Sequence, residues 1–383
     1  MDRKPVIVYC TPSLYIPGGV ERVLTTKANY LADVAGYTVY IILTDGQNKP
    51  PYYPLSSRIR LIRLDIDFEE LWGLPLYKKI IVYLQKQRIY KRKLRETLFS
   101  IKPDITVSLM RREINFITSI KDGSKKVGEL HVNKKHYRNF NGADKNMVTT
   151  LFSKIWMMSL VRHIKRLDRF VVLCKEDREN WHQLRRVEVI GNPLPFPIVP
   201  ANHQLGNQAI AVGRYTYQKG FDLLIQAWST VACKHPEWKL FIYGKGNPTP
   251  YEELVRKLNL SNHVILKADT PDIIDKYRES SIFVLSSRYE GFGMVVAEAM
   301  ACGVPPVSFA CPCGPGDIIR DGEDGILVEN GNVEQLAEKI CYLIENEDIR
   351  KEMGRKACIN VRRFEVEQIM SQWIKLFEEL LKL

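Results

Sequence analysis

Two loops in the second half of the chain carry the charged side chains that a phosphate-bearing ligand needs. Residues 213–220 read Gly-Arg-Tyr-Thr-Tyr-Gln-Lys-Gly, so Arg214 follows a hydrophobic run and Lys219 precedes the next helical pattern. Two fixed cations that converge on one point neutralise the charge of a departing diphosphate. The sequence therefore predicts a diphosphate-binding loop that begins at Gly213. Gly244, in a Gly-Lys-Gly turn after a later run, is a weaker candidate for a contact with the same ligand.

The second loop, residues 286–303, combines two carboxylates with a glycine-rich helix start. It holds Glu290, Gly291, Phe292, Gly293 and, eight residues after the first carboxylate, Glu298. At about 1.5 Å per residue the carboxylates are at most about 12 Å apart, which suits two hydroxyl-bearing parts of one ligand rather than a shared proton. Free N–H groups at the helix start suit a phosphate. A helix cap with one buried ion pair is the alternative interpretation.

The first half offers a glycine pair and a histidine in similar places. Gly18 and Gly19 lie between a hydrophobic run and a helical pattern, where backbone N–H groups can approach an anion. The pattern is not Gly-x-Gly-x-x-Gly, so a dinucleotide is not indicated, and a plain turn is the alternative. His131 ends another run on the side where ligands of parallel sheets bind. A lone histidine is often only structural.

The sequence does not predict a metal site. Cys311 and Cys313 are close together but lack a second pair, so we interpret them as packed loop residues. Eight cysteines in 383 residues are too few for a disulfide scaffold and indicate a reducing compartment. Asp65-Ile66-Asp67 has the Asp-x-Asp spacing of a metal-binding motif, but a motif this short often occurs by chance. We expect Arg214 and Lys219 to replace a metal ion.

Short hydrophobic runs alternate with helical patterns along the whole chain, as in parallel sheets that are covered on both faces. In the first half the predicted strands are residues 6–10, 38–44, 60–64, 105–110, 126–131 and 169–174. In the second half they are residues 209–214, 240–244, 264–267, 281–286, 304–309 and 325–328. The sequence thus predicts an α/β protein.

Two series of strands predict two doubly wound, Rossmann-like domains. Residues 189–197 contain three prolines, which are typical of a stiff connection. We expect a first domain over residues 1–193 and a second over 194–364. Residues 365–383 repeat apolar side chains at helical spacing and are predicted to form a helix that docks on the first domain.

The net charge of +12 is concentrated in the first half, where 35 Lys and Arg face 19 Asp and Glu. The densest part is a predicted amphipathic helix over residues 77–99, in which Ile80, Leu84, Leu94 and Leu98 recur at roughly helical spacing. Its cations include Lys86, Arg88, Lys91, Arg92, Lys93 and Arg95. Residues 147–167 form a second such segment. Three interpretations of this positive charge remain. The helices present a solvated face without a partner, or they bind an anionic membrane or lipid-diphosphate head group, or they bind a nucleic acid.

Composition excludes several classes of protein. Hydrophobic residues make up 45% and charged residues 26%, so the chain is neither disordered nor fibrous. No apolar run reaches the roughly 18 residues of a spanning helix. The apolar run at residues 6–10 is too short for a signal peptide, and we expect a cytoplasmic protein.

The motifs resemble those of glycosyltransferase family 4, the retaining sugar-nucleotide transferases of the GT-B fold. The resemblance is carried by Glu-Gly-Phe-Gly-x-x-x-x-Glu from residue 290, Gly-Arg-x-x-x-x-Lys-Gly from 213, Asn-Pro-Leu-Pro from 192, and residues 313–328. It implies that Arg214 and Lys219 bind the donor diphosphate, Glu298 the ribose, and Glu290 with the backbone of 291–293 the sugar. It also implies that Gly18 and Gly19 close on the phosphates and that His131 lies near the sugar.

Residues 313–319 resemble members that build bacterial capsule, O-antigen or lipid-linked oligosaccharides. The resemblance implies a nucleotide-sugar donor, most simply UDP-linked, no metal or other cofactor, and a glycan acceptor. Together with the basic helices it favours a polyprenyl-diphosphate-linked acceptor and peripheral attachment to the inner face of the membrane. A sugar-nucleotide epimerase of the same fold is one alternative, and a basic nucleic-acid-binding protein is another, although no nucleic-acid-binding motif accompanies the charge.

Overall fold

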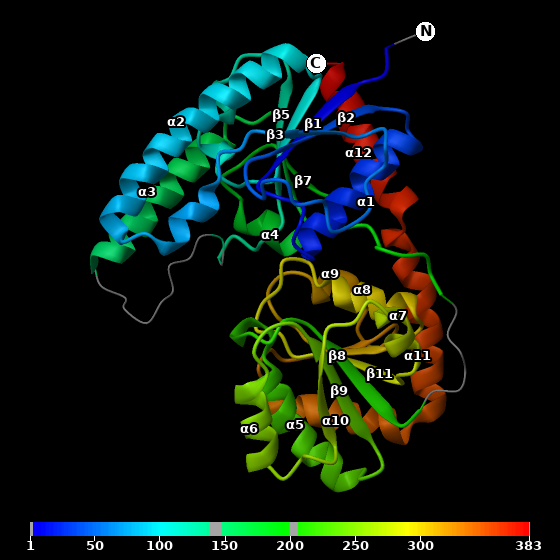
Figure 1. Cartoon of the computed structure of the whole chain (residues 1–383). Coiled ribbons are helices and arrows are strands. Elements are labelled where there is room, and N and C mark those ends of the chain that lie inside the picture. Colours follow the sequence, from blue (N-terminus) through cyan, green and yellow to red (C-terminus); the bar gives the residue numbers. More distant parts are fainter. Residues whose placement is uncertain (1–2, 136, 138–146, 200–205, 383) are drawn as a thin grey trace. The chain divides into compact units, whose positions relative to one another are not determined.

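The computed structural model describes residues 3–135, 137, 147–199 and 206–382, which form two compact units (Figure 1). Unit 1 comprises Met1–Leu173, Asp177–Pro193 and Ile369–Leu383, and unit 2 comprises Cys174–Glu176 and Leu194–Gln368. The main division at Pro193 and Leu194 falls within the proline-rich stretch of the sequence. The C-terminal helix divides between Gln368 and Ile369, so the part that joins unit 1 starts four residues after the predicted start at residue 365.

Unit 1 is built on a seven-stranded sheet in the order β3-β2-β1-β4-β5-β6-β7, with every neighbouring pair parallel. Its strands are β1 (Val6–Thr11), β2 (Thr38–Leu43), β3 (Arg60–Arg63), β4 (Ile105–Ser108), β5 (Lys125–Leu130), β6 (Arg169–Val172) and β7 (Val187–Val189). The six predicted strands are present. The sequence analysis missed β7, which ends where the proline-rich stretch begins.

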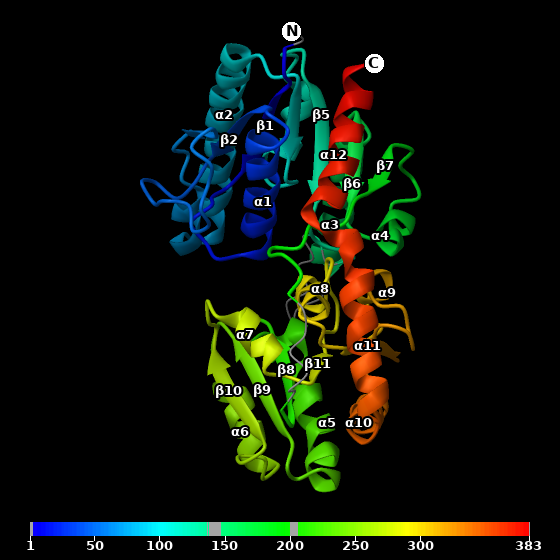
Figure 2. The same ribbon diagram turned by 90° about the vertical axis from the view of Figure 1, so that its right-hand side faces the viewer.

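Helices cover both faces of this sheet (Figure 2). They are α1 (Gly19–Asp33), α2 (Leu76–Ile101), α3 (Met147–Ile164), α4 (Lys175–Asn180) and α12 (Val366–Leu381). Side chains of α2 and α3 share one core with Val8 and Cys10 of β1. Because alternate residues of a strand point to opposite faces, Tyr9 lies on the other face, where its ring is near Lys27 of α1. None of the helices in the described part of the chain combines the length and hydropathy of a membrane span.

The basic helix α2 differs from its prediction in two ways. Leu94 and Leu98 are fully buried, whereas Ile80 and Leu84 are 53% and 52% exposed, and in that half of the helix the partly buried Val82 and Tyr83 pack on the core instead. Two of its cations are also engaged. Lys86 Nζ donates to the carbonyl oxygens of Ile66 and Asp67 at 2.6 and 2.8 Å, and Lys93 Nζ donates to that of Leu64 at 2.6 Å. Lys86 and Lys93 therefore fasten α2 to the segment after β3.

Unit 2 is built on a six-stranded parallel sheet in the order β10-β9-β8-β11-β12-β13. Its strands are β8 (Gln208–Val212), β9 (Lys239–Gly244), β10 (Val264–Ala268), β11 (Ile282–Leu285), β12 (Pro306–Phe309) and β13 (Ile326–Val328). All six were predicted, and two parallel α/β units confirm the fold class. Its helices are α5 (Phe221–Lys234), α6 (Thr249–Lys257), α7 (Ile273–Arg278), α8 (Met294–Ala301), α9 (Pro315–Ile318), α10 (Val333–Glu345) and α11 (Glu347–Asn360).

The different surroundings of the α2 cations lead to a stability prediction. Lys86→Met removes the donor from two carbonyl oxygens and an ion pair with Glu70 at 2.8 Å, in a side chain that is only 13% exposed. We expect the free energy of unfolding to fall by about 1–3 kcal/mol, the usual cost of leaving such groups without partners. Urea unfolding followed by circular dichroism measures this.

Lys91→Met is the matched control, because Lys91 lies on the exposed side of the same helix. Its effect should stay within about 0.5 kcal/mol. Equal effects of the two substitutions would contradict a fastening role for Lys86.

Candidate active site

Three loops of unit 2 meet at one edge of its sheet. Strand β8 lies between β9 and β11, and all three strands are parallel, so their carboxyl ends lie at the same edge. The loop after β8 contains Gly213 to Gly220, the loop after β9 contains Gly244, and the loop after β11 leads to α8. The structure thus brings the predicted loops of this half together, as expected for ligand-binding loops of a parallel sheet.

A lysine, a glutamate and a serine form the centre of this edge. Lys219 Nζ lies 2.6 Å from Glu290 Oε1, and Ser287 Oγ donates to the same oxygen at 2.6 Å. The side chains of Lys219 and Glu290 are only 12% and 8% exposed. An ammonium group has three N–H donors, so Lys219 keeps donors for a ligand while the carboxylate holds it in place. The sequence analysis assigned Lys219 and Glu290 to different parts of one donor without predicting their contact, and it missed Ser287, whose residue type carries no signal in that motif.

Two glycines permit close packing around Lys219. A Cβ at Gly213 would lie 3.0 Å from the Cδ and Cε atoms of Lys219, so the lysine side chain passes tightly over this glycine. Gly220 has φ +61°, and a Cβ there would clash with the carbonyl oxygen of Ser286. Ser286 Oγ in turn donates to the Lys219 carbonyl oxygen at 2.9 Å. The start of α5 is therefore held directly against the end of β11.

Arg214 and Arg288 have different surroundings. The Arg214 side chain is exposed and has no hydrogen bond or ion pair to the residues that the structure describes, and its convergence with Lys219 on a diphosphate stays a prediction. Arg288 instead makes a two-pronged ion pair with Asp222 at 2.9 and 2.6 Å and stacks over the Tyr217 ring at 3.9 Å. The sequence analysis missed this contact, which joins the loops after β8 and β11.

The helix start at residues 291–293 and Glu298 have the predicted local structure. Gly293, at φ +91°, precedes α8, and Glu298 lies in the second turn of that helix. Glu298 is buried, and its Oε2 accepts a hydrogen bond from the Tyr277 hydroxyl at 3.1 Å. The Phe292 ring is buried against Phe364 at 5.3 Å between centroids, so only the Phe292 backbone is available to a ligand.

Gly244 has a packing reason of its own. A Cβ at Gly244 would clash with the carbonyl oxygen of Gly213, so the residue lets the ends of β8 and β9 approach closely. Its assignment to the donor stays a prediction.

In the part of the chain that the structure describes, no three His, Cys, Asp or Glu side chains gather as metal ligands would. Asp65 and Asp67 both have left-handed backbone, and the carbonyl oxygen of Asp67 is the partner of Lys86.

Unit 1 places its predicted residues at the carboxyl edge of its own sheet. Gly18 and Gly19 lie between β1 and α1, and His131 directly follows β5. The His131 ring is only 6% exposed, and its Nε2 lies 3.1 Å from Glu129 Oε1. A Cβ at Gly19 would meet nothing within 4 Å, whereas a Cβ at Gly18 would clash with the Glu21 carboxylate, which lies against this helix start. The sequence analysis missed Glu129, although it lies two residues before the histidine.

The exposed side of α2 is a second candidate surface. We define the α2 face as the exposed residues Tyr77, Ile80, Ile81, Leu84, Arg88, Lys91, Arg92 and Arg95. Its amino-terminal half is apolar and its carboxy-terminal half is cationic. An exposed apolar group of this size beside cations is unusual on a protein that only meets water.

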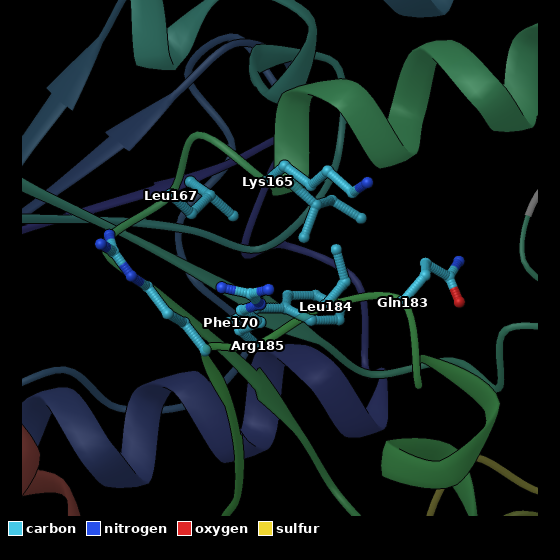
Figure 3. Close-up of a pocket in the computed structure, with 8 residues that line it drawn as sticks. Lys165, Leu167, Phe170, Gln183, Leu184 and Arg185 are labelled. Carbon is cyan, nitrogen blue, oxygen red and sulfur yellow. The ribbon is translucent and has the colours of Figure 1, made fainter.

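A hollow of about 520 Å³ lies elsewhere in unit 1 (Figure 3). Its lining includes Leu167, Phe170 and Arg185, which come from the segments that lead into β6 and β7. The hollow is therefore at the amino ends of these strands. His131 and Gly19 lie at the carboxyl ends, so the hollow does not belong to the predicted site.

Comparison with known proteins agrees with this geometry. Residues 201–358 match the family described as "Glycosyl transferases group 1". The chain carries a group 1 glycosyltransferase domain. It is 28% identical over 93% of its length to an uncharacterized glycosyltransferase of Haemophilus influenzae, of which it covers 95%.

Two further relatives of this glycosyltransferase have more informative names. The amylovoran biosynthesis glycosyltransferase AmsD of Erwinia amylovora is 32% identical over 54% of this chain and 61% of the relative. The poly(ribitol-phosphate) alpha-N-acetylglucosaminyltransferase of Staphylococcus aureus is 30% identical over 66% of this chain and 51% of the relative.

Solved structures show the fold. Sucrose-phosphate synthase of Thermosynechococcus elongatus superposes with a TM-score of 0.80 at 18% identity, covering 98% of this chain and 99% of the other. A TarM variant of S. aureus, solved in complex with UDP, alpha-GlcNAc-glycerol and fondaparinux, has a TM-score of 0.75 at 17% identity, covering 97% and 99%. The glycosyltransferase therefore has the GT-B fold.

The tight approach at Gly220 leads to a second stability prediction. Gly220→Ala forces a side chain into the left-handed region and against the backbone of β11. We expect unit 2 to lose about 1–3 kcal/mol or more of its free energy of unfolding, because neither strand nor helix start moves easily. Thermal or urea unfolding measures the loss.

Gly316→Ala in the same unit is the control, because a Cβ there meets nothing within 4 Å and the backbone is not left-handed. It should leave stability nearly unchanged. A Gly220→Ala protein as stable as the Gly316→Ala protein would refute the close approach.

Proposed function

We propose that this glycosyltransferase moves a hexose or N-acetylhexosamine from a UDP-sugar to a growing glycan, with retention of configuration. The observation that carries the proposal is the nearly buried group of Lys219, Glu290 and Ser287, where three loops of the glycosyltransferase domain meet. The UDP complex of the TarM variant supports the nucleotide. The relatives named for amylovoran biosynthesis and for poly(ribitol phosphate) support a glycan acceptor.

In this proposal Lys219 and Arg214 bind the donor diphosphate. Glu290 and the backbone N–H groups of residues 291–293 hold the transferred sugar, and Glu298 binds the ribose hydroxyls. Gly18 and Gly19 contact the donor phosphates, and His131 lies beside the sugar. Because Glu290 already fixes the Lys219 ammonium, this charge needs little reorganisation when the diphosphate departs.

The transfer needs no protein nucleophile in this scheme. The bond between the anomeric carbon and the diphosphate oxygen breaks, and the acceptor hydroxyl forms its new bond on the same face of the sugar. The departing diphosphate takes the hydroxyl proton as that bond forms. Lys219 and Arg214 stabilise the negative charge that builds up on the diphosphate, so we propose that no metal ion is required.

Removing Lys219 tests this scheme. A thermal-shift screen of nucleotide diphosphates and their sugars first identifies the donor, since a ligand at a hundred times its Kd stabilises the folded protein by about 2.7 kcal/mol. Lys219→Ala should then lower turnover of that donor by about 10²-fold or more, because it removes a preorganised charge from the leaving group. Release of UDP from the donor, measured at saturating donor, gives the turnover.

Lys257→Ala is the matched control, since Lys257 is an exposed cation at the end of α6 in the same unit. Glu298→Ala should weaken UDP binding in the same screen. Near-normal turnover of Lys219→Ala would count against the scheme, as would activity that EDTA abolishes and manganese restores. A new nucleotide sugar formed without any acceptor would instead indicate an epimerase.

We further propose that the acceptor is linked to a polyprenyl diphosphate and that the α2 face attaches the enzyme to the inner face of the membrane. Apolar side chains at one end of this face suit the acyl boundary, and the cations at the other end suit anionic head groups. Lys86 and Lys93 are left out of this assignment because backbone carbonyls already hold them.

Vesicle binding tests the α2 face. Replacing Arg88, Lys91, Arg92 and Arg95 with Gln should weaken co-sedimentation with vesicles that contain phosphatidylglycerol by about 1 kcal/mol per charge. Ile81→Ser with Leu84→Ser should weaken it as well, because both side chains are more than half exposed.

The control replaces four exposed cations of unit 2, Lys234, Lys239, Arg256 and Lys257, with Gln. This variant loses the same charge and should bind vesicles normally. Equal losses of vesicle binding in the two charge variants would show that net charge alone, and not the α2 face, governs binding. Unchanged vesicle binding by the α2 variant would mean that the α2 face is a solvated surface. If the same substitutions change the oligomeric state, the face instead contacts a second copy of the chain.

A further inference from the structure

A buried ion pair in unit 1 has no part in the function described so far. Lys27 of α1 places its Nζ 2.6 Å from both carboxylate oxygens of Glu129, the fifth residue of β5. The two side chains are only 1% and 2% exposed. Taking two charges out of water is costly, and an apolar pair of similar size is often at least as stable. The pair is therefore hard to explain by stability alone.

His131 connects this pair to the carboxyl edge of the sheet. Its Nε2 lies 3.1 Å from Glu129 Oε1, so the carboxylate stands between the ammonium of Lys27 and the imidazole. In an imidazole, the partner of one ring nitrogen determines which nitrogen carries the proton. Nε2 makes no hydrogen bond in this conformation, but a carboxylate oxygen 3.1 Å away repels a lone pair on that nitrogen and therefore favours a proton on Nε2.

The C-terminal helix closes the cluster. The Trp373 ring of α12 lies over Lys27 Nζ at 3.6 Å from its centroid, and the Tyr9 ring of β1 is 5.7 Å away. Both aromatic rings are fully or almost fully buried. Figure 2 shows α1 and α12 beside each other on this face of the sheet. Aromatic faces stabilise a cation that has lost its water, so Trp373 helps to keep the Lys27 ammonium charged and in place.

The charges around Glu129 keep it ionised. Burial by itself would raise the pKa of Glu129, but Lys27 and then His131 outweigh burial and lower this pKa to about 2. The carboxylate is thus present over the whole physiological pH range. A charge that is fixed, buried and directed at an imidazole is suited to orienting that imidazole.

We propose that Glu129 is a positioning residue for His131 and that Lys27, enclosed by Trp373, holds Glu129 in place. This proposal rests on the proposed function, in which His131 lies beside the transferred sugar. It assigns the C-terminal helix a part in the reaction, through one aromatic side chain and a buried lysine. Lys27 contacts Glu129, Glu129 contacts the histidine, and in this proposal neither Lys27 nor Glu129 contacts the substrate.

The experiment removes the ion pair without leaving a buried charge. Lys27→Met with Glu129→Leu fills the space with apolar side chains, so the melting temperature should stay near that of the wild type or rise. Release of UDP from the donor found in the screen should nevertheless fall about 10- to 100-fold, the range seen when the group that orients a metal-bound histidine is removed. The KM for the donor should change little.

Glu129→Gln combined with His131→Ala tests whether the two residues act together. If Glu129 acts only through His131, Glu129→Gln should slow the wild type but have no further effect in the His131→Ala protein. A structural contribution of Glu129 would instead multiply with the histidine effect.

A spectroscopic readout does not depend on activity. Two-bond ¹H–¹⁵N spectra of histidine-labelled protein, assigned with His131→Ala, should show the proton of His131 on Nε2 in the wild type. In the Lys27→Met, Glu129→Leu protein we expect a mixture of the two tautomers, because the carboxylate that selects Nε2 is gone.

The possible failures are distinguishable. If His131→Ala turns over normally, the histidine has no role, and both that part of the proposed function and the positioning of His131 are wrong. If His131→Ala is slow but the apolar pair is fully active, or if the two effects multiply, only the positioning role is overturned. An unchanged tautomer in the apolar variant overturns it as well.

Discussion

A nearly buried Lys–Glu contact at 2.6 Å organises the ligand edge of each unit. In unit 2 Lys219, just before the first helix, meets Glu290 from the loop after β11. In unit 1 Lys27, on the first helix, meets Glu129 near the end of β5. Each contact joins the first strand-helix step of its sheet to a later strand, so the loops that carry the site residues depend on charge as well as on packing. Such buried pairs contribute little to stability, so their position at these edges points to another role.

The fold followed from patterns that act over short stretches of chain. Strands covered on both faces need nearly continuous apolar runs, so all but β7 of the described strands were legible in the sequence. β7 was missed because Val187–Val189 is short and merges with the proline-rich stretch. The loops of unit 2 were also predictable, because parallel strands place their carboxyl ends at one edge.

The contacts within the site were much harder to predict. Lys27 and Glu129 are 102 positions apart, and neither has a residue type or spacing that points to the other. Counting charges also did not show which lysines of α2 are held by the protein itself. It treats every lysine alike, whereas Lys86 and Lys93 bind backbone carbonyls and Lys91 does not. The helical repeat also suggested that Ile80 and Leu84 are buried, whereas Val82 and Tyr83 face the core, because apolar residues stand on more than one side of this part of the helix.

The two pairs differ in one respect that separates what they can do. Lys219 and Glu290 keep 12% and 8% of their side-chain surface exposed, so a ligand can reach the ammonium and use its remaining donors. Lys27 and Glu129 keep 1% and 2%, and an aromatic ring closes over the lysine, so that among the residues that the structure describes His131 connects their charge to the edge. Partial exposure suits a group that meets a departing anion, and complete burial suits one that holds another residue still. In the scheme that we propose, the same chemical pair therefore serves binding in one unit and orientation in the other, with burial deciding between them.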